Sequence, residues 1–456
     1  MGKRIAVIGG GIAGLAAAVR LRDRAPADTE ITVYEQSGTL GGKLRTGWLA
    51  GVTVERGAES FLAGAPEGGE SAGVGFARRL GMAGAFVHPA PVPAALASDR
   101  GLIPLPPGTL LGVPGSPPQG IADADDGRPL LNPDEDISVG ALVRPRYGDA
   151  VVDRLVEPLL GGVYAGRADR LSLAATMPAL ARAARTEHTL AGAVRAAQAA
   201  TVRQPGRPVF TAIEGGLTRL VSAAGEASGA RFRLGLPVRE LTRTAHGWRL
   251  LLGPVPAPQT DDVDAVVLAV PARPAARLLA GVEADAAAAA GALEYASVAL
   301  VALALPPGTP VPELSGFLVP PGAGTLVNAA TFVTHKWPHL VRDGGPVIVR
   351  MSIGRAGEEE RLQRDDGDLA AQAHAELGEL LGVPLPPPAA SWVQRWGGAL
   401  PQYAPGHLDR VAAARAALAS HRGIALAGAA YDGVGIPACV ASGETAAEDI
   451  AKSLED

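Results

Sequence analysis

The segment RIAVIGGGIAG, residues 4–14, decides the fold of this chain. It begins as an apolar run rich in β-branched residues, which predicts a buried strand, and it ends in glycines with the spacing G-x-G-x-x-G. An Ala- and Leu-rich pattern from Leu15 to about Arg24 predicts a helix directly after the glycines. In such a strand–turn–helix the glycines allow a tight turn, let backbone approach a pyrophosphate and let the helix pack against the strand. The segment therefore predicts a Rossmann-like unit that binds a dinucleotide.

A second predicted strand, residues 30–34, supports this interpretation. It ends at Glu35, close to the ~20 residues beyond the glycines at which such units place a carboxylate for the ribose. The N-terminus of the helix would also present free N–H groups and the positive end of its dipole to the phosphates. A glycine turn in some other α/β protein is the alternative that this pattern leaves open.

The composition describes a large globular protein and excludes several classes. The 456 residues are 47% hydrophobic and 19% charged, with a mean hydropathy of +0.18, so a sizeable core and more than one domain are expected. A net charge of −5 argues against a nucleic-acid partner. The single cysteine, Cys439, cannot form an internal disulfide and fits a reducing compartment. We find no apolar stretch of the ~20 residues that span a bilayer and no cleavable signal, and so expect a cytoplasmic protein without an integral membrane segment.

The predicted elements divide the chain into interleaved parts. Residues 66–204 are first loop-rich and then mostly helical, whereas patterns of nucleotide-binding character return at 205–275 and again at 420–456. We expect a discontinuous cofactor domain made of 1–65, 205–275 and 420–456, with a substrate-binding domain at 276–419. The expected fold class is α/β (α+β overall): a Rossmann-like domain, an interleaved domain with a mixed sheet, and a helical domain.

Three further segments favour FAD as the dinucleotide. Paired glycines followed by a cation at 41–43 suit a phosphate or ribityl chain. Small residues at 57–60 would let a planar ring lie against backbone. Residues 431–437 form a glycine-rich turn that opens the last predicted helix, whose dipole would stabilise negative charge on a reduced flavin. Because this turn lies at the far end of the chain from the first glycines, an extended FAD across the domain is expected.

The motifs resemble those of the FAD-dependent protoporphyrinogen and coproporphyrinogen III oxidases of haem biosynthesis, within the amine-oxidase-like flavoprotein superfamily. The resemblance covers nearly the whole chain, and the first glycine turn is its least specific part. It includes GGVYAGRADRLS at 161–172, EGGL at 214–217 and KWP at 336–338. Its most specific parts are the G-x-Y-A-G stretch at 162–166, RW at 395–396 with PQY at 401–403, and GVGIP at 433–437.

The resemblance implies a set of FAD contacts. The first glycine turn would hold the pyrophosphate, Glu35 the ribose, and Lys43 the phosphates. The backbone of Val238 would meet the adenine, and Trp396 would line the isoalloxazine ring, although a core role for either side chain is the alternative. The implied contact residues are Gly9, Gly10, Gly11, Ile12, Ala13, Gly14, Glu35, Gln36, Lys43, Gly57, Ala58, Glu59, Ser60, Val238, Trp396, Val434, Gly435 and Ile436.

The resemblance also implies a reaction in which the cofactor does the chemistry. Oxidation of coproporphyrinogen III to coproporphyrin III removes six electrons, in three two-electron rounds that end on dioxygen and release hydrogen peroxide. We find no nucleophile–base constellation and no metal cluster, and so assign no catalytic residue and no metal. The family often has basic residues after the segment at 57–63, where this chain has Gly64 and Ala65, so Arg167 or Lys336 would bind the substrate propionates here.

Several alternatives stay open at this stage. Protoporphyrinogen IX is the competing substrate, and quinones are a competing electron acceptor. An amine oxidase, a carotenoid desaturase or a non-catalytic dinucleotide-binding protein are more distant alternatives. Besides the porphyrinogen and dioxygen, a transient contact with a ferrochelatase is a candidate partnership.

Overall fold

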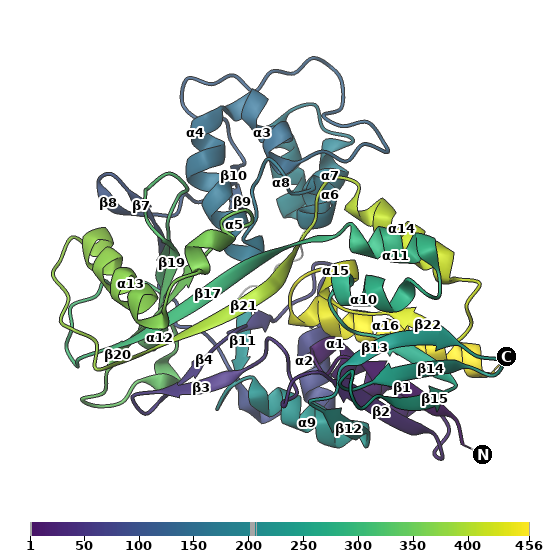
Figure 1. Ribbon diagram of the computed structural model, residues 1–456. Helices are drawn as coiled ribbons and strands as arrows, with labels where there is room; N and C mark the ends of the chain where they lie inside the picture. Colours follow the sequence, from purple (N-terminus) through teal and green to yellow (C-terminus); the bar gives the residue numbers. More distant parts are fainter. Residues whose placement is uncertain (1, 201–205, 207, 456) are drawn as a thin grey trace.

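The computed structural model describes residues 2–200, 206 and 208–455. Figure 1 shows three parts: a five-stranded sheet with its helices near both chain ends, a helical bundle at the top of the view, and a seven-stranded sheet on the left. Segments far apart in the sequence meet in both of these sheets, so the chain passes between the parts several times.

The first strand lies at the centre of a parallel sheet with the order β12-β2-β1-β16-β22. The strand register pairs Ile5 with both Ile31 and Ala265. Early, middle and late segments of the chain thus share one sheet, and the α/β fold class expected from the sequence is confirmed. The strands are β1 (Arg4–Ile8), β2 (Glu30–Glu35), β12 (Arg231–Leu234), β16 (Ala265–Leu268) and β22 (Ile424–Leu426).

Helices cover both faces of this sheet. On one side, α1 (Ile12–Arg24) packs along α16 (Ile436–Glu455) so closely that a Cβ at Gly443 would lie 2.1 Å from the carbonyl oxygen of Ala13. The same side holds α9 (Thr218–Ser228) and α2 (Ala72–Arg79). The other side is covered by a small antiparallel sheet and three helices: β13 (Val238–Arg243), β14 (Trp248–Leu252), β15 (Gln259–Val263), α10 (Ala272–Leu279), α11 (Ala284–Gly291) and α14 (His407–Leu418).

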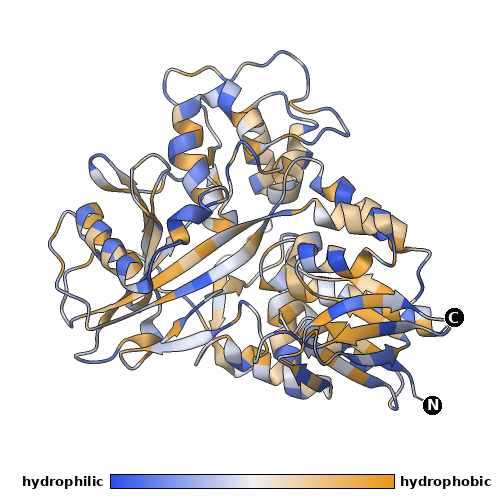
Figure 2. Cartoon of the chain, viewed as in Figure 1, coloured by the Kyte–Doolittle hydropathy of each residue, from blue (hydrophilic) through white to orange (hydrophobic). Residues whose placement is uncertain are grey.

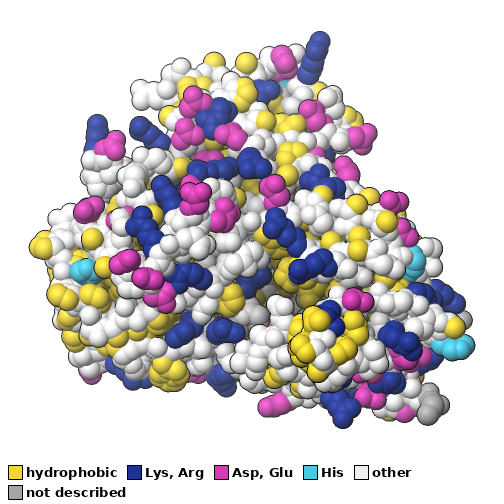
Figure 3. Space-filling model, in the orientation of Figure 1, with side chains coloured by type: hydrophobic (Ala, Val, Ile, Leu, Met, Phe, Trp, Pro, Cys, Tyr) yellow, Lys and Arg dark blue, Asp and Glu magenta, His cyan; other side chains and the backbone are white. Residues whose placement is uncertain are grey.

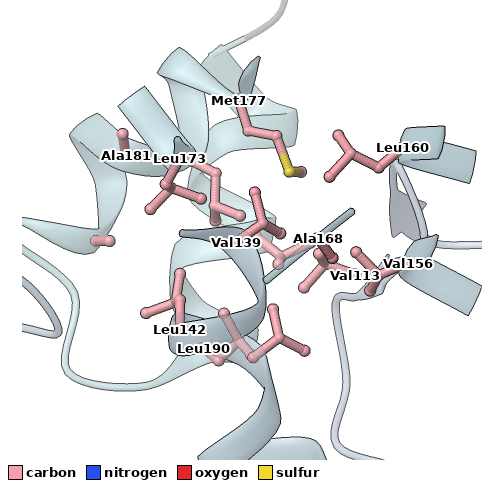
Figure 4. Packing of buried hydrophobic residues seen from close by; sticks show 14 of the residues in the cluster. Val113, Val139, Leu142, Val156, Leu160, Ala168, Leu173, Met177, Ala181 and Leu190 are labelled. Carbon is pink, nitrogen blue, oxygen red and sulfur yellow. The ribbon is translucent and has the colours of Figure 1, made fainter. Parts of the chain in front are cut away.

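The helical bundle has a hydrophobic core of its own. Figure 4 shows side chains from several of its helices, among them Leu142, Leu160 and Leu173, converging on this core. Ser138 begins the bundle as an N-cap, because its hydroxyl accepts a hydrogen bond from the Ala141 N–H. The elements are β9 (Thr109–Leu110), β10 (Val113–Pro114), α3 (Val139–Tyr147), α4 (Asp149–Val151), η2 (Val152–Val156), α5 (Glu157–Tyr164), α6 (Leu173–Thr176), α7 (Pro178–Ala184) and α8 (Leu190–Ala200).

The third part is a seven-stranded sheet with the order β21-β17-β20-β19-β18-β7-β8. Its strands are β7 (Ala94–Ser98), β8 (Gly101–Pro104), β17 (Glu294–Leu305), β18 (Gly316–Leu318), β19 (Val327–Phe332), β20 (Val347–Ile353) and β21 (Ala390–Gln402). The long strands β17 and β21 run side by side, and β17 is the more hydrophobic of the two (Figure 2). Helix α13 (Asp366–Leu381) covers one face of the sheet.

One part of the predicted domain organisation needs correction. The range 66–204 was expected to form a loop-rich and helical unit, but β7 and β8 belong to the seven-stranded sheet, where β7 pairs in parallel with β18. Prolines on both sides of these short strands hide their pattern in the sequence. The remaining domain boundaries stay a prediction.

Short elements connect the three parts. The hairpin β3 (Thr46–Leu49) with β4 (Val52–Glu55) packs against the seven-stranded sheet through Leu49, Val52 and Val54. A small sheet of β5 (Phe61–Leu62), β11 (Phe210–Ile213) and β6 (Phe86–Val87) adjoins it. The other short elements are η1 (Ala83–Ala85), α12 (Val333–Lys336), η3 (Pro338–Leu340), η4 (Glu359–Leu362) and α15 (Ala429–Asp432).

The surface is mixed in charge. On the face shown in Figure 3, Lys and Arg side chains lie interspersed with Asp and Glu. Among the helices of the described chain, none is both long enough and apolar enough to cross a membrane. The described residues also contain no group of three or more His, Cys, Asp or Glu side chains placed to hold a metal ion.

Candidate flavin site

The first glycine turn has the geometry that a close phosphate contact needs. Gly9 has a φ of +112°, and a Cβ there would lie 2.4 Å from the carbonyl oxygen of Ala269. A Cβ at Gly14 would lie 2.0 Å from the carbonyl oxygen of Gly9, so this glycine lets α1 approach β1. A Cβ at Gly11, in contrast, would meet nothing within 4 Å. Gly11 therefore borders open space at the helix N-terminus.

The N-terminus of α1 has free donors at this opening. The first hydrogen bond of the helix runs from the Leu15 N–H to the Gly11 carbonyl, so the amides of Ile12 and Ala13 lie ahead of the helical ladder. Gly11 caps the helix without a side-chain bond. Together with the helix dipole, these amides suit a phosphate.

Glu35 closes the turn from the second strand. Its carboxylate accepts hydrogen bonds from the N–H groups of Gly10 and Ser37, both at 2.8 Å. The neighbouring Gln36 is exposed. Val238 lies close by, because the Leu236 N–H donates to the Glu35 carbonyl and the Gly235 N–H to the Ser37 carbonyl. The structure therefore brings Glu35 and the start of β13 together, as an adenosine site requires.

The second glycine pair runs beside the first turn. The Gly41 N–H donates to the Gly10 carbonyl at 2.8 Å, and Gly42 has a φ of +56° and faces Gly11. Lys43 follows in a largely enclosed position. Among the described residues, its ammonium group has no hydrogen-bond or ion-pair partner, and burial lowers its pKa. An enclosed cation next to open space and free amides fits the phosphate groups of FAD.

The segment at 55–60 lies against the second glycine pair. The Ala58 N–H donates to the Lys43 carbonyl, and a Cβ at Gly57 would lie 2.0 Å from that same oxygen. The same Cβ would lie 3.3 Å from the Trp396 ring, so Gly57 is packed between the two. The Trp396 indole N–H donates to the Arg56 carbonyl at 2.6 Å. Trp396 and Gly57, which are distant in sequence, therefore share one wall of the site.

Glu59 is tied to the seven-stranded sheet. Its carboxylate contacts the Lys336 ammonium at 2.8 Å and the Arg350 guanidinium at 2.5 Å, and it accepts the Trp337 indole N–H. Burial alone would raise the pKa of Glu59, but Arg350 and then Lys336 outweigh it and hold the pKa at about 2. Glu59 is thus an anion that links the segment at 55–60 to the sheet, and Ser60 is the half-buried residue after it.

The last predicted turn also reaches this region. Gly428, ahead of α15, lies near Ala13 of α1, and its N–H donates to Ser442 of α16. Gly433 and Gly435 have φ angles of +116° and +106°, which side chains rarely adopt. Val434 and Ile436 flank this turn and pack on different cores, Val434 toward the helical bundle and Ile436 toward α1. The two ends of the chain therefore meet, as the sequence predicts.

The motifs of the resemblance contact one another. The Gln402 side chain donates to the Tyr164 carbonyl at 2.8 Å, and the rings of Tyr403 and Tyr164 meet edge to face at 5.8 Å. The Tyr403 hydroxyl donates to the Ala429 carbonyl, directly before the last turn. The stretches at 162–172 and 401–403 thus join the helical bundle, the long strand β21 and the cofactor sheet.

One face of the seven-stranded sheet forms a wall beside these residues. Trp396 is paired with Val298, and residues paired across strands point to the same side. The same face carries Leu300, Ser352 and Ala329 in neighbouring strands, all of them partly exposed. Its far end is covered by α5, where a Cβ at Gly162 would lie 3.3 Å from Leu318. Val298, Leu300 and Ala329 give this wall apolar side chains beside the Trp396 ring, with Ser352 and Arg350 as polar neighbours, so it can pack against a ring system.

The two cations proposed for the propionates are already paired. Lys336 contacts Glu59, and Arg167 forms an ion pair with Glu358. Glu59 also pairs with Arg350, and Glu358 also pairs with Arg361, so each carboxylate is shared by two cations. The assignment of Lys336 and Arg167 to the propionates remains a prediction.

Comparison with known proteins identifies the family. Residues 12–451 match the model of the flavin-containing amine oxidoreductases. The chain belongs to this family. Its cofactor is FAD, in agreement with the glycine turns and the enclosed Lys43.

The relatives are similar over their full length. The chain is 36% identical to the coproporphyrinogen III oxidase of Mycobacterium tuberculosis, over 98% of this chain and 97% of that protein. It is 30% identical to the coproporphyrinogen III oxidase of Bacillus subtilis, over 98% and 97% of the two chains. A crystal structure from Exiguobacterium sp. 255-15, provisionally assigned as a protoporphyrinogen oxidase, has a TM-score of 0.85 and 30% identity over the whole of both chains.

Two further residues, Arg45 and Arg350, contact this region and were not predicted from the sequence. Arg45 lies with its guanidinium 5.7 Å from the Trp396 ring centre and donates to the Thr39 hydroxyl. Arg350 reaches the segment at 55–59 from β20. A lone arginine inside the apolar strand VIVRMSI was the available signal, because a charge in a buried strand needs a partner.

Proposed function

We propose that this protein is an FAD-dependent coproporphyrinogen III oxidase of haem biosynthesis. One coproporphyrinogen III and three dioxygen molecules would give one coproporphyrin III and three hydrogen peroxide molecules. The observation that carries the proposal is the position of Trp396, which contacts Gly57 of the cofactor site and lies on the same sheet face as Val298 and Leu300. The full-length relatives named for this activity support it.

When bound, FAD supplies an acceptor that takes two electrons at a time. The chain's own residues then have to bind the cofactor and orient the substrate against it. The amides of Ile12 and Ala13 and the Lys43 ammonium would hold the phosphates, and Glu35 the ribose. The apolar wall of Val298 and Leu300 would hold the tetrapyrrole and exclude water, which favours transfer of a hydride over side reactions. Each round also releases one proton from the substrate, and we assign no acid–base side chain of the wall to accept it.

A second candidate substrate is protoporphyrinogen IX. The Exiguobacterium structure, with its provisional assignment, favours it. The two substrates differ in the number of propionates, four against two. Lys336 and Arg167, the two cations considered for the propionates, are each paired with an acid of the chain that an arginine also contacts.

The substrate choice is tested with purified protein loaded with FAD, in air. We expect fluorescent coproporphyrin to form from coproporphyrinogen III faster than protoporphyrin from protoporphyrinogen IX, with about three hydrogen peroxide molecules per porphyrin. A matched substitution is Trp396→Leu, which removes the indole from the wall and is expected to lower the rate. The reverse substrate preference would assign the protein to protoporphyrinogen IX.

The proposal includes the cellular setting. We place the protein in the cytoplasm, with dioxygen as the acceptor. The product is a metal-free porphyrin, and a transient contact with a ferrochelatase would pass it on. Pull-down of a ferrochelatase by the FAD-loaded protein, with and without coproporphyrin, tests this contact.

A further inference from the structure

Arg350 is the only charged residue of β20 and lies in a buried part of the sheet. Its side chain is 13% exposed. The register pairs it with Ala302 of β17 and Thr331 of β19. It therefore lies on the same face as Leu300, which is two residues from Ala302 along β17, and on the face that carries Trp396.

The guanidinium of Arg350 makes three hydrogen bonds, and all three reach the segment at 55–59. One nitrogen, Nη1, donates to the carbonyl oxygens of Glu55 at 3.1 Å and Gly57 at 3.0 Å. The other, Nη2, donates to the Glu59 carboxylate at 2.5 Å. A planar guanidinium can satisfy backbone carbonyls and a carboxylate at once, whereas a lysine ammonium is a single point charge.

The rest of the cluster keeps Glu59 in place without Arg350. Lys336 supplies a second cation at 2.8 Å, and the Trp337 indole donates to the same carboxylate. A substitution at Arg350 that keeps a positive charge therefore leaves no buried carboxylate without a partner. What it does remove is the pair of bonds to the carbonyls of Glu55 and Gly57.

The contact at Gly57 reaches the flavin site itself. Gly57 packs between the Lys43 carbonyl and the Trp396 ring, and tolerates no added atom on the Lys43 side. A shift of this glycine toward either neighbour would therefore displace Lys43 or Trp396. Arg350 thus lies between the wall predicted to hold the substrate and the segment predicted to border the flavin.

We propose that Arg350 is a positioning residue of the oxidation: by binding the carbonyls of Glu55 and Gly57 from β20, it sets the separation between the flavin-bordering segment and the apolar wall. Hydride transfer depends steeply on this separation, since misplacement by about 1 Å can cost about 100-fold in rate. The inference rests on the proposed function for its kinetic consequence. Its structural part, the placement of the segment at 55–59 by Arg350, is independent of the proposed function.

The decisive substitution is Arg350→Lys in the FAD-loaded protein. We expect FAD to be retained, KM for coproporphyrinogen III to change little, and both kcat and the rate of anaerobic flavin bleaching to fall about 10- to 100-fold. Glu59→Gln keeps the shape and the acceptor for Trp337 but weakens the ion pair, and it should lower the same rates by less. The matched control is Arg144→Lys, since Arg144 contacts three carboxylates on the helical bundle and should leave the rates unchanged.

The visible circular dichroism of the bound flavin gives a readout that needs no substrate. We expect it to change in Arg350→Lys and not in Arg144→Lys. If Arg350→Lys keeps both the rates and this spectrum, or loses FAD altogether, the positioning role is wrong. If the unsubstituted protein oxidises no porphyrinogen while the spectrum still changes in Arg350→Lys, the proposed function fails and the placement of the segment by Arg350 stands.

Discussion

Gly11 and Gly14 belong to one motif, but the structure predicts opposite consequences of replacing each by alanine. At Gly11 the backbone has a φ of −74°, which alanine adopts freely, and the added Cβ would meet nothing within 4 Å. The stability of the apoprotein should therefore change by less than about 1 kcal/mol. At Gly14 the Cβ would lie 2.0 Å from the Gly9 carbonyl oxygen, so helix α1 must move away from β1. Such overpacking costs about 1–3 kcal/mol or more.

FAD affinity should separate the two variants further. A methyl group at Gly11 occupies the space through which a phosphate approaches the amides, and the loss of one charge-assisted hydrogen bond is worth about 1.5–3 kcal/mol. This corresponds to a Kd weakened about 10- to 100-fold. The assay is urea unfolding of the apoproteins together with titration of FAD by the quenching of its fluorescence. An apoprotein of Gly11→Ala that is as unstable as that of Gly14→Ala, or an unchanged Kd in Gly11→Ala, would refute this reasoning.

Three further predictions follow from buried polar groups. Lys43→Met should raise the thermal midpoint of the apoprotein, because burial lowers the pKa of Lys43 and its charge has no partner within the described part of the chain. The same substitution should weaken FAD binding, and a destabilised apoprotein would contradict the prediction. Burial raises the pKa of Glu55 to about 7, above its value of 4.5 in the unfolded chain. The free energy of unfolding should therefore include the full contribution of Glu55 below pH 4.5. This contribution, on the order of 3 kcal/mol, should be lost as the pH rises through 7. Urea unfolding at pH 5 and pH 8 should show a smaller loss in Glu55→Gln than in the unsubstituted protein, and an equal loss would exclude Glu55 as the cause. Tyr403→Phe leaves the Ala429 carbonyl without its hydroxyl donor and should cost about 1–3 kcal/mol in urea unfolding with the flavin spectrum unchanged, whereas a changed spectrum would place Tyr403 in the cofactor site.

The cofactor-binding part of the fold could be predicted from the sequence because its elements are encoded by local patterns. The glycine turn, the strand ending at Glu35 and the last predicted helix, which opens at the turn of residues 431–437, each appear as periodic or turn patterns within a few residues. The structure has these elements as β1, β2 and α16, with bounds shifted by only a residue or two. The meeting of the first glycines with the last turn also follows, since an extended dinucleotide needs both.

The seven-stranded sheet was harder to predict from the sequence, for a physical reason. Its pairings join segments that are far apart, such as β7 with β18, and no local pattern encodes a partner strand. The roles of Glu59 and Lys336 were hidden in the same way, because their ion pair forms only when the sheet is assembled. The sequence could indicate that Glu59 belongs to the segment expected to border the flavin, but not that two cations from the sheet hold its carboxylate.

The most direct test is anaerobic addition of coproporphyrinogen III to the purified yellow protein, followed by the visible absorbance of the flavin. Since the substrate gives up six electrons and each flavin takes two, one porphyrinogen should bleach about three flavins, and coproporphyrin fluorescence should appear in step. A protein that never retains FAD on reconstitution, or a bound flavin that keeps its colour with both porphyrinogens, would contradict the account.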